Sequence, residues 1–265
     1  MSLRMKRLLG LGIILVGLTG CGGGSSSNDS YTGEDQTKPI ENQELQGFYS
    51  GTTSNSQDVG ILFKSNGEYW GIYSQLGSRN LTGGFIHGKI TTSGEKAASN
   101  NLKDFHIFSG STYTGSVDAT VRTKDSLNGS LRYGSSGVNF NTKYDQILNK
   151  EVNLSDIKGN HSGQVGILQG VENANITITQ SGTSGASAQA GSIYGTGSSG
   201  CSFNGELQRS STKDHFDFYI KFGGSPCYMA NQTLSGVITY DASTKYIRAA
   251  AVNSDRSNGV LFIGR

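Results

Sequence analysis

Short stretches of alternating apolar and polar residues recur along most of the chain, and turn-forming residues separate them roughly every 8 to 15 positions. A period of two is typical of a β-strand with one buried face. In the first half of the body the pattern predicts strands near 46–53, 58–64, 68–74, 81–90, 102–108, 112–122, 127–133 and 137–144. In the second half it predicts strands near 157–163, 174–180, 187–195, 201–208, 214–222, 233–240, 245–252 and 259–264.

Many short antiparallel strands joined by tight turns are typical of a small closed barrel or a sandwich. The clearest turn is Ser65–Glu68, because its central Asn-Gly pair tolerates the positive φ angles of a type I′ hairpin. Only residues 145–151 have a pattern compatible with a short helical turn. The sequence therefore predicts an all-β protein of two tandem antiparallel units, each with about eight strands. It leaves the choice between barrel and sandwich open.

Three short segments recur in the same order in the two halves, which is a sign of an internal repeat. The matched pairs are 46–51 with 158–163, 104–107 with 217–220, and 127–133 with 234–240. Chance similarity between strands rich in glycine and serine is the alternative explanation. On the repeat interpretation the first β unit covers 45–150 and the second covers 151–265.

The N-terminal residues have the pattern of a secretory signal peptide. Arg4, Lys6 and Arg7 precede an apolar run, Leu8–Leu18, which small residues follow. As a helix this run would be roughly 16 Å long, against about 30 Å of bilayer hydrocarbon, so it is too short to span a membrane. We expect residues 1–20 to be removed as a leader.

The leader ends in Leu18-Thr19-Gly20-Cys21, which resembles the lipobox of bacterial lipoproteins. The resemblance implies that Cys21 receives a thioether-linked diacylglycerol, that the leader is cleaved before it, and that the new amine is acylated, for example with palmitate. Gly22 stands where the inner-membrane retention signal of enteric bacteria has an aspartate, which favours the outer membrane. The membrane would then be a partner through the N-terminal lipid. The alternative is an ordinary leader with a chance cysteine.

Residues 22–44 contain one isoleucine as their only large aliphatic residue and have no periodicity, so we expect a flexible tether after the lipidated cysteine. Random-coil scaling puts the body roughly 25 Å from the anchor.

Composition and charge narrow the function classes. The 265-residue chain has 39 glycines but two prolines, which excludes collagen and proline-rich disorder. The leader takes three of the 22 basic residues and none of the 20 acidic ones, which leaves 19 against 20. A body this close to neutral lacks the basic footprint of a nucleic-acid-binding protein, so we expect no nucleic acid partner.

The chain has three cysteines, and lipidation of Cys21 would leave Cys201 and Cys227 as a pair in an oxidising compartment. We expect a structural disulfide between them. A redox-active pair is the alternative, but such pairs normally have closer spacing and an electropositive setting.

Motifs for catalysis or cofactor binding are missing or lack the required context. Gly195–Gly200 matches G-x-G-x-x-G, but the following residues alternate like a strand instead of opening a helix, so we expect a loop. The sequence has no G-x-S-x-G, no H-E-x-x-H and no EF-hand loop. S-x-x-K occurs three times, each time beside a turn, as chance predicts in a serine-rich chain. We expect no cofactor.

Alternation divides the strand at 214–222 into an apolar and a polar face. The apolar face has Phe216, Phe218, Ile220 and Phe222, and the polar face has His215, Asp217, Tyr219 and Lys221. His215 and Asp217 could supply two metal ligands, but a stable zinc site needs a third or fourth. We therefore expect no metal site and a solvated polar face. Asp104 and His106 repeat this spacing in the first unit, which we attribute to a shared fold element.

The segment around the single tryptophan offers a candidate contact surface. Trp70 and Ile72 alternate with Tyr69 and Tyr73, so one pair should be buried and the other exposed. We expect Trp70 in the core, and Tyr69 and Tyr73 as an exposed platform for a protein or glycan partner. The alternative is two scattered surface tyrosines.

The leading functional hypothesis is a non-enzymatic binding or envelope-interaction module at the outer membrane, since loops and sheet faces remain available for recognition. The alternatives are an envelope hydrolase with dispersed catalytic residues and a structural lipoprotein that braces the envelope. Lipid-anchored, glycine-rich tandem β units also resemble the barrel domains of host-factor-binding surface lipoproteins from Gram-negative bacteria. This resemblance is architectural and implies no binding residue. The sequence leaves open whether the body lies on the periplasmic or the cell-surface side.

Overall fold

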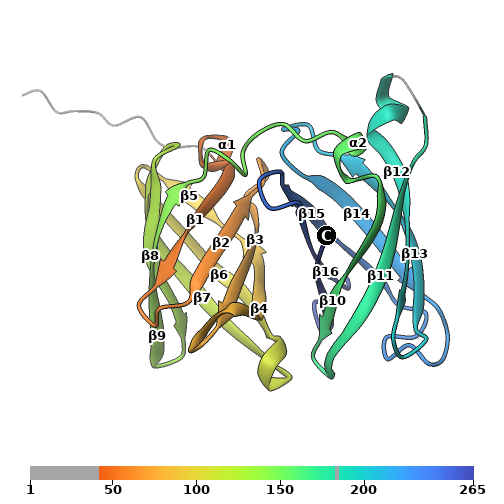
Figure 1. The fold of residues 1–265 in the computed structure, drawn as a ribbon. Helices are drawn as coiled ribbons and strands as arrows, with labels where there is room; N and C mark the ends of the chain where they lie inside the picture. Colours follow the sequence, from red (N-terminus) through yellow and green to blue (C-terminus); the bar gives the residue numbers. More distant parts are fainter. Residues whose placement is uncertain (1–41, 183–184) are drawn as a thin grey trace, which may run out of the picture. The chain divides into compact units, whose positions relative to one another are not determined.

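The computed structural model describes residues 42–182 and 185–265. It is nearly all-β, with 64% strand and 6% helix, and it forms two antiparallel eight-stranded barrels in tandem (Figure 1). The prediction of two tandem antiparallel β units is therefore confirmed, and both units are barrels instead of sandwiches. Closure pairs every strand of the two rings on both sides, which removes the free edges that invite aggregation.

The first barrel contains nine strands, of which eight close the ring. They are β1 (Gly47–Thr53), β2 (Asp58–Phe63), β3 (Glu68–Gln75), β4 (Ser78–Lys89), β5 (Thr91–Ser93), β6 (Lys96–His106), β7 (Ser111–Arg122), β8 (Ser126–Tyr133) and β9 (Ser136–Tyr144). The sheet order is β4-β3-β2-β1-β9-β8-β7-β6, and β4 pairs with β6 to complete the ring. The short β5, which alternation did not predict, pairs with the start of β6.

The second barrel is closed by the pairing of its first and last strands, β10 and β17. Its strands are β10 (Gly159–Ile167), β11 (Gly170–Gln180), β12 (Ala190–Gly197), β13 (Ser202–Arg209), β14 (Phe216–Phe222), β15 (Thr233–Asp241), β16 (Tyr246–Val252) and β17 (Gly259–Gly264). Each pairs with its neighbour in the chain, so the topology is a simple meander.

The helices are short. They are α1 (Asn42–Leu45), η1 (Ile107–Ser109), α2 (Leu154–Ile157) and η2 (Gly185–Gln189). Residues 145–149 form the expected short helical turn, in which the N–H of Asn149 donates to the C=O of Asp145 at 3.1 Å, and this single turn is not continued into a helix. The Asp145 carboxylate accepts hydrogen bonds from the backbone N–H groups of Ile147 and Leu148, as the N-cap residue of a helical turn does.

The first of the three repeated segments marks an equivalent position in the two barrels. Each barrel begins with a four-residue helix, α1 or α2, followed by a glycine with positive φ, Gly47 at 125° and Gly159 at 133°. The last helical residues, Leu45 and Ile157, are fully buried and belong to the two barrel cores. A short helix therefore plugs the same end of both barrels.

The other two repeated segments are not equivalent. Asp104 faces the interior of the first barrel, whereas Asp217 alternates with the inward-facing phenylalanines of β14 and faces outward. Residues 127–133 form the seventh strand of the first barrel's ring, whereas 234–240 belong to the sixth strand of the second. These two matches therefore do not mark equivalent positions in the two barrels.

The predicted hairpin at Ser65–Glu68 is present, but its turn type differs. The N–H of Gly67 donates to the C=O of Lys64 at 2.9 Å, and only Gly67 in this turn has a positive φ, 81°. This is a turn followed by a left-handed glycine, the common three-residue hairpin loop, and it replaces the expected type I′ turn.

Three apolar cores hold the described residues together. One fills the first barrel and one fills the second. The third joins the outer faces of the two barrels, and it contains Phe48, Leu62, Trp70, Phe85, Phe105, Ile107, Val237, Ala250, Val252 and Leu261. Phe85 and Phe105 stack with ring centroids 4.6 Å apart, and a Cβ on Gly259 would lie 2.6 Å from Phe85. The two barrels are therefore packed against each other through a core of their own.

Candidate functional site

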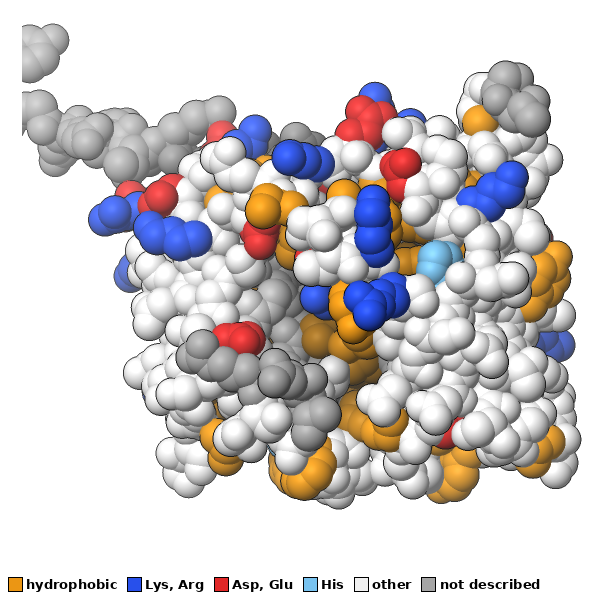
Figure 2. All heavy atoms as spheres, viewed as in Figure 1, with side chains coloured by type: hydrophobic (Ala, Val, Ile, Leu, Met, Phe, Trp, Pro, Cys, Tyr) orange, Lys and Arg blue, Asp and Glu red, His pale blue; other side chains and the backbone are white. Residues whose placement is uncertain are grey.

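A cleft of about 1120 Å³ lies where the two barrels meet. Its lining draws on both barrels and is mainly apolar in the centre, with Trp70 and Ile72 from β3 and Val237, Ala250 and Ile263 from the second barrel. Figure 2 shows apolar side chains gathered in the hollow at the middle of the visible face. The cleft is thus the open continuation of the core between the barrels.

The rim of the cleft carries large apolar side chains that remain exposed. Phe108, Ile147 and Val171 line the cleft with exposed fractions of 66%, 53% and 56%. Phe108 and Val171 lie at one end of the cleft, where η1 contacts β11, and Ile147 lies towards the other end, in the turn after β9. Polar groups from Asp145, Arg248 and other residues share the rim, so an occupant would meet an apolar floor and a mixed border.

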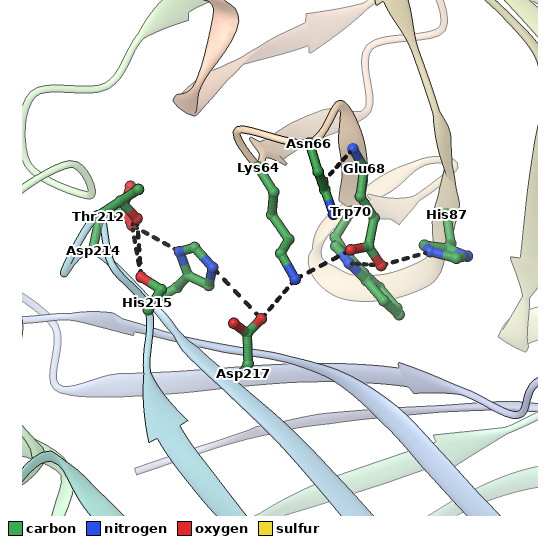
Figure 3. A network of polar contacts seen from close by, with 10 residues as sticks. Lys64, Asn66, Glu68, Trp70, His87, Thr212, Asp214, His215 and Asp217 are labelled. Atoms are coloured by element: carbon green, nitrogen blue, oxygen red, sulfur yellow. Dashed lines mark hydrogen bonds and ion pairs between the residues drawn. The ribbon is translucent and has the colours of Figure 1, made fainter. Parts of the chain in front are cut away.

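A polar network crosses from one barrel to the other beside the shared core (Figure 3). The Lys64 ammonium lies 2.7 Å from Asp217 Oδ1 and 3.1 Å from Glu68 Oε2. Glu68 Oε1 in turn contacts His87 Nε2 at 3.1 Å and accepts a hydrogen bond from Trp70 Nε1 at 3.2 Å. Lys64 therefore links a carboxylate of each barrel.

The electrostatics of this network favour its charged form. Burial alone would raise the pKa of Glu68, but the hydrogen bond to His87 and the charge of Lys64 outweigh it and lower the pKa to about 2. Burial would lower the pKa of Lys64, but Asp217 and Glu68 outweigh it and the pKa is raised. The ion pairs remain formed at neutral pH.

His215 at the far end of the network is buried, with 2% exposure. Its Nδ1 lies 2.7 Å from Asp214 Oδ1, which also accepts a hydrogen bond from Thr212, and its Nε2 lies 3.8 Å from Asp217 Oδ1 without a hydrogen-bond partner. The expected solvated face on this strand is therefore wrong at His215 and correct at Tyr219, which is exposed. No group of three or more metal-ligating side chains occurs among the residues that the structure describes.

A second contact between the barrels comes from the loop before β17. The Arg256 guanidinium donates to the backbone carbonyl of His87 at 3.1 Å and to that of Asn101. A side chain of the second barrel thereby binds two backbone segments of the first. Together with the Lys64 network, it gives the two barrels polar contacts beside their shared apolar core.

The predicted tyrosine platform is wrong as a surface feature. Tyr69 is 2% exposed in the core of the first barrel, and Tyr73 also points inward and donates its hydroxyl to Asp104 at 2.7 Å. Trp70 is buried as predicted, but on the outer face of the barrel against the second one. The alternation was correct; both faces of β3 are covered, so neither pair lies on the surface.

The remaining sequence expectations divide between described and undescribed residues. The Cys201–Cys227 disulfide is present. No helix follows Gly195–Gly200, and the expected loop is present only at 198–200, because Gly195–Gly197 belong to β12. Cys21, the leader and the tether up to residue 41 lie outside the described residues. No helix within 42–182 and 185–265 is long and apolar enough to cross a membrane.

Comparison with known proteins finds likenesses to solved structures alone. No family model matches it, and no curated protein matches it. A Bacteroides fragilis protein described as an outer membrane protein shares 11% identity over 84% of this chain and 98% of its own, with a TM-score of 0.29. The isotype 1 transferrin binding protein B of serogroup B Neisseria meningitidis shares 8% identity over 79% of this chain and 65% of its own, with a TM-score of 0.31. With scores this low, neither likeness bears on the site.

Sequence reasoning missed most of the residues between the barrels. Their signal was consecutive large apolar residues within a strand: Phe48-Tyr49 in β1, Leu62-Phe63 in β2, Tyr69-Trp70 in β3 and Phe85-Ile86 in β4. Every one of these residues is buried. Adjacent residues of a strand point to opposite faces, so such pairs in four neighbouring strands indicate a sheet that is covered on both sides.

Proposed function

We propose that this chain is an outer-membrane-anchored lipoprotein that acts as a non-enzymatic binding module, and that the cleft between its barrels takes a segment of a partner protein. The observation that carries the proposal is the cleft itself, with an apolar floor from both barrels and exposed apolar side chains on its rim.

The size and lining of the cleft favour a protein segment over a small ligand. Its volume of about 1120 Å³ exceeds the roughly 300 to 1,000 Å³ that is usual for small-molecule pockets. Phe108, Ile147 and Val171 are exposed, and burying large apolar side chains is a main source of affinity between proteins. A glycan would be matched better by hydroxyl and amide groups than by this floor.

The anchoring part of the proposal rests on the leader and on the Leu18–Cys21 motif. Its test is Cys21→Ala, followed by fractionation of cells. The variant should leave the membrane fraction and fail to mature as a lipoprotein, and a variant that stays membrane-bound and matures normally would contradict the anchor. Protease treatment of intact cells then distinguishes a surface-exposed body from a periplasmic one.

Site-specific photo-crosslinking in cells tests the cleft. A photo-reactive phenylalanine analogue replaces Ile147 on the rim, and a matched control replaces Tyr228, which is 65% exposed but does not line the cleft. We expect a discrete protein adduct from position 147 that Val171→Glu abolishes, and none from position 228. Equal adducts from both positions, or no adduct at 147, would contradict the cleft as the binding site.

A further inference from the structure

The end of the first barrel opposite α1 carries a cluster of five inward-facing polar and aromatic side chains. They come from the ends of β3, β6, β7 and β8, and they are Tyr73, Asp104, His106, Tyr113 and Tyr133. These residues are up to 60 positions apart in the sequence. The closed barrel brings them together because these strand ends meet at one opening.

Asp104 is the centre of the cluster and is 6% exposed. Its Oδ1 accepts a hydrogen bond from the Tyr73 hydroxyl at 2.7 Å, and its Oδ2 accepts one from the Tyr133 hydroxyl at 2.8 Å. No lysine or arginine whose side chain the structure describes forms an ion pair with it. Burial raises the pKa of Asp104, and the two hydroxyl donors offset this only in part. The positive neighbour that the structure describes is His106, whose charge also acts to lower this pKa.

The aromatic rings form an arc from one oxygen of Asp104 to the other. Tyr73 and His106 have ring centroids 6.0 Å apart, His106 and Tyr113 are 6.3 Å apart, and Tyr113 and Tyr133 are 6.3 Å apart. The His106 ring is held in place because its Nδ1 accepts a hydrogen bond from the Ser109 N–H. Tyr113 is 45% exposed, so solvent reaches the arc.

A carboxylate beside several aromatic rings is suited to a cation. Ring faces attract a cation within about 6 Å, and several aromatic rings around one point are the usual way in which proteins bind alkylated ammonium groups. The carboxylate adds the negative charge that such a group needs as it loses water. We propose that this end of the first barrel binds an alkylammonium group. This site shares Tyr73 with the lining of the cleft, but it does not depend on the function proposed for the cleft.

Calorimetric titration of the mature protein in a maltoside detergent tests the site. The probes are choline, its neutral isostere 3,3-dimethyl-1-butanol, and Nα-acetyl-lysine amide. We expect choline to bind at least tenfold more tightly than the neutral isostere, because the isostere has the same shape without the charge. The lysine derivative distinguishes recognition of a quaternary ammonium from recognition of a primary one.

Variants locate the binding. Asp104→Asn keeps the size and one acceptor of the side chain and should weaken choline binding at least tenfold. Tyr113→Leu should weaken it about threefold to fivefold, and because Tyr113 is partly exposed this variant should fold even if Asp104→Asn does not. The matched control Tyr194→Leu, at an exposed tyrosine of the second barrel, should leave binding unchanged. Equal binding of choline and its isostere, or full binding by a folded Tyr113→Leu, would overturn the proposal.

Discussion

The two barrels share a ring of eight strands and a plugging helix, yet they are filled differently. The second barrel has a mainly apolar filling, with Phe216, Phe218, Ile220, Phe222 and Phe262 among its core residues. The first barrel places a carboxylate, Asp104, and tyrosine hydroxyls inside. A closed barrel satisfies its backbone whatever its filling, so an interior carboxylate reflects something other than the needs of the fold.

The ends of the barrels opposite the helices differ in the same way. The second barrel is closed there by the Cys201–Cys227 disulfide, with Phe203 and Phe222 packed nearby. The first barrel ends in the Asp104 cluster. The second barrel is filled and closed mainly by apolar side chains and a disulfide. The first barrel instead keeps polar groups at one end and at its contact with the second barrel.

The largest effect should come from the apolar filling of the second barrel. Phe216 is fully buried, so Phe216→Ala should lower the free energy of unfolding by about 3 to 5 kcal/mol, measured by urea denaturation. Tyr219→Ala, on the outer face of the same strand, is the matched control and should cost less than about 1 kcal/mol. Similar losses for both would show that the interior of this barrel is not its main source of stability.

Removing the disulfide should have the next largest effect and should be confined to one barrel. Cys201 and Cys227 are 26 positions apart, and the chain-entropy relation gives roughly 3.6 kcal/mol for a loop of about this length. Cys201→Ala combined with Cys227→Ala should therefore lower stability by about 2 to 4 kcal/mol. Hydrogen exchange should show faster opening in β12–β14, and faster exchange in β1–β3 instead would contradict the separation of roles.

Acid should weaken the border between the barrels through Glu68. Its pKa is about 2 in the folded protein against an ordinary value of 4.5, so its contribution is complete above pH 4.5 and is lost as the pH falls towards 2. The full contribution is about 2 to 3 kcal/mol. Urea titrations at pH 6 and pH 3 should show a smaller pH effect in Glu68→Gln than in the unaltered protein. An unchanged pH effect would mean that Glu68 is not paired as described.

The smallest effect should come from the ion pair between the barrels. A double-mutant cycle with Lys64→Met and Asp217→Asn should give a coupling free energy of about 1 kcal/mol, because the pair is only partly buried. Raised salt should reduce this coupling. A coupling near zero would leave the apolar core as the only contact that matters between the barrels.

Strand positions could be predicted from the sequence because they depend on local information. Alternation and turn residues located all sixteen strands that close the two barrels, and alternation correctly separated Tyr69 from Trp70. Local sequence patterns could not predict what covers the outer faces of the strands. Trp70 and His215 lie on outward-facing positions yet are buried, because the other barrel or a loop covers the strand there. Alternation along one strand carries no information about such a cover.

The Asp104 cluster could not be predicted from the sequence, for a different reason. Asp104 and His106 were noticed, but their partners Tyr73, Tyr113 and Tyr133 lie on other strands, and only the order and register of the ring bring them together. The disulfide, by contrast, could be predicted, because only Cys201 and Cys227 remain once Cys21 is assigned to lipidation.

The central claim is that the two barrels are packed as one body, so that the cleft between them is a fixed site. Trp70 is the single tryptophan and lies buried between the barrels, so its fluorescence reports this border alone. During urea denaturation we predict a blue-shifted native emission that moves to the red in the same transition as the far-UV circular dichroism. A red-shifted emission in native buffer, or a shift that precedes the loss of strand signal, would contradict the claim.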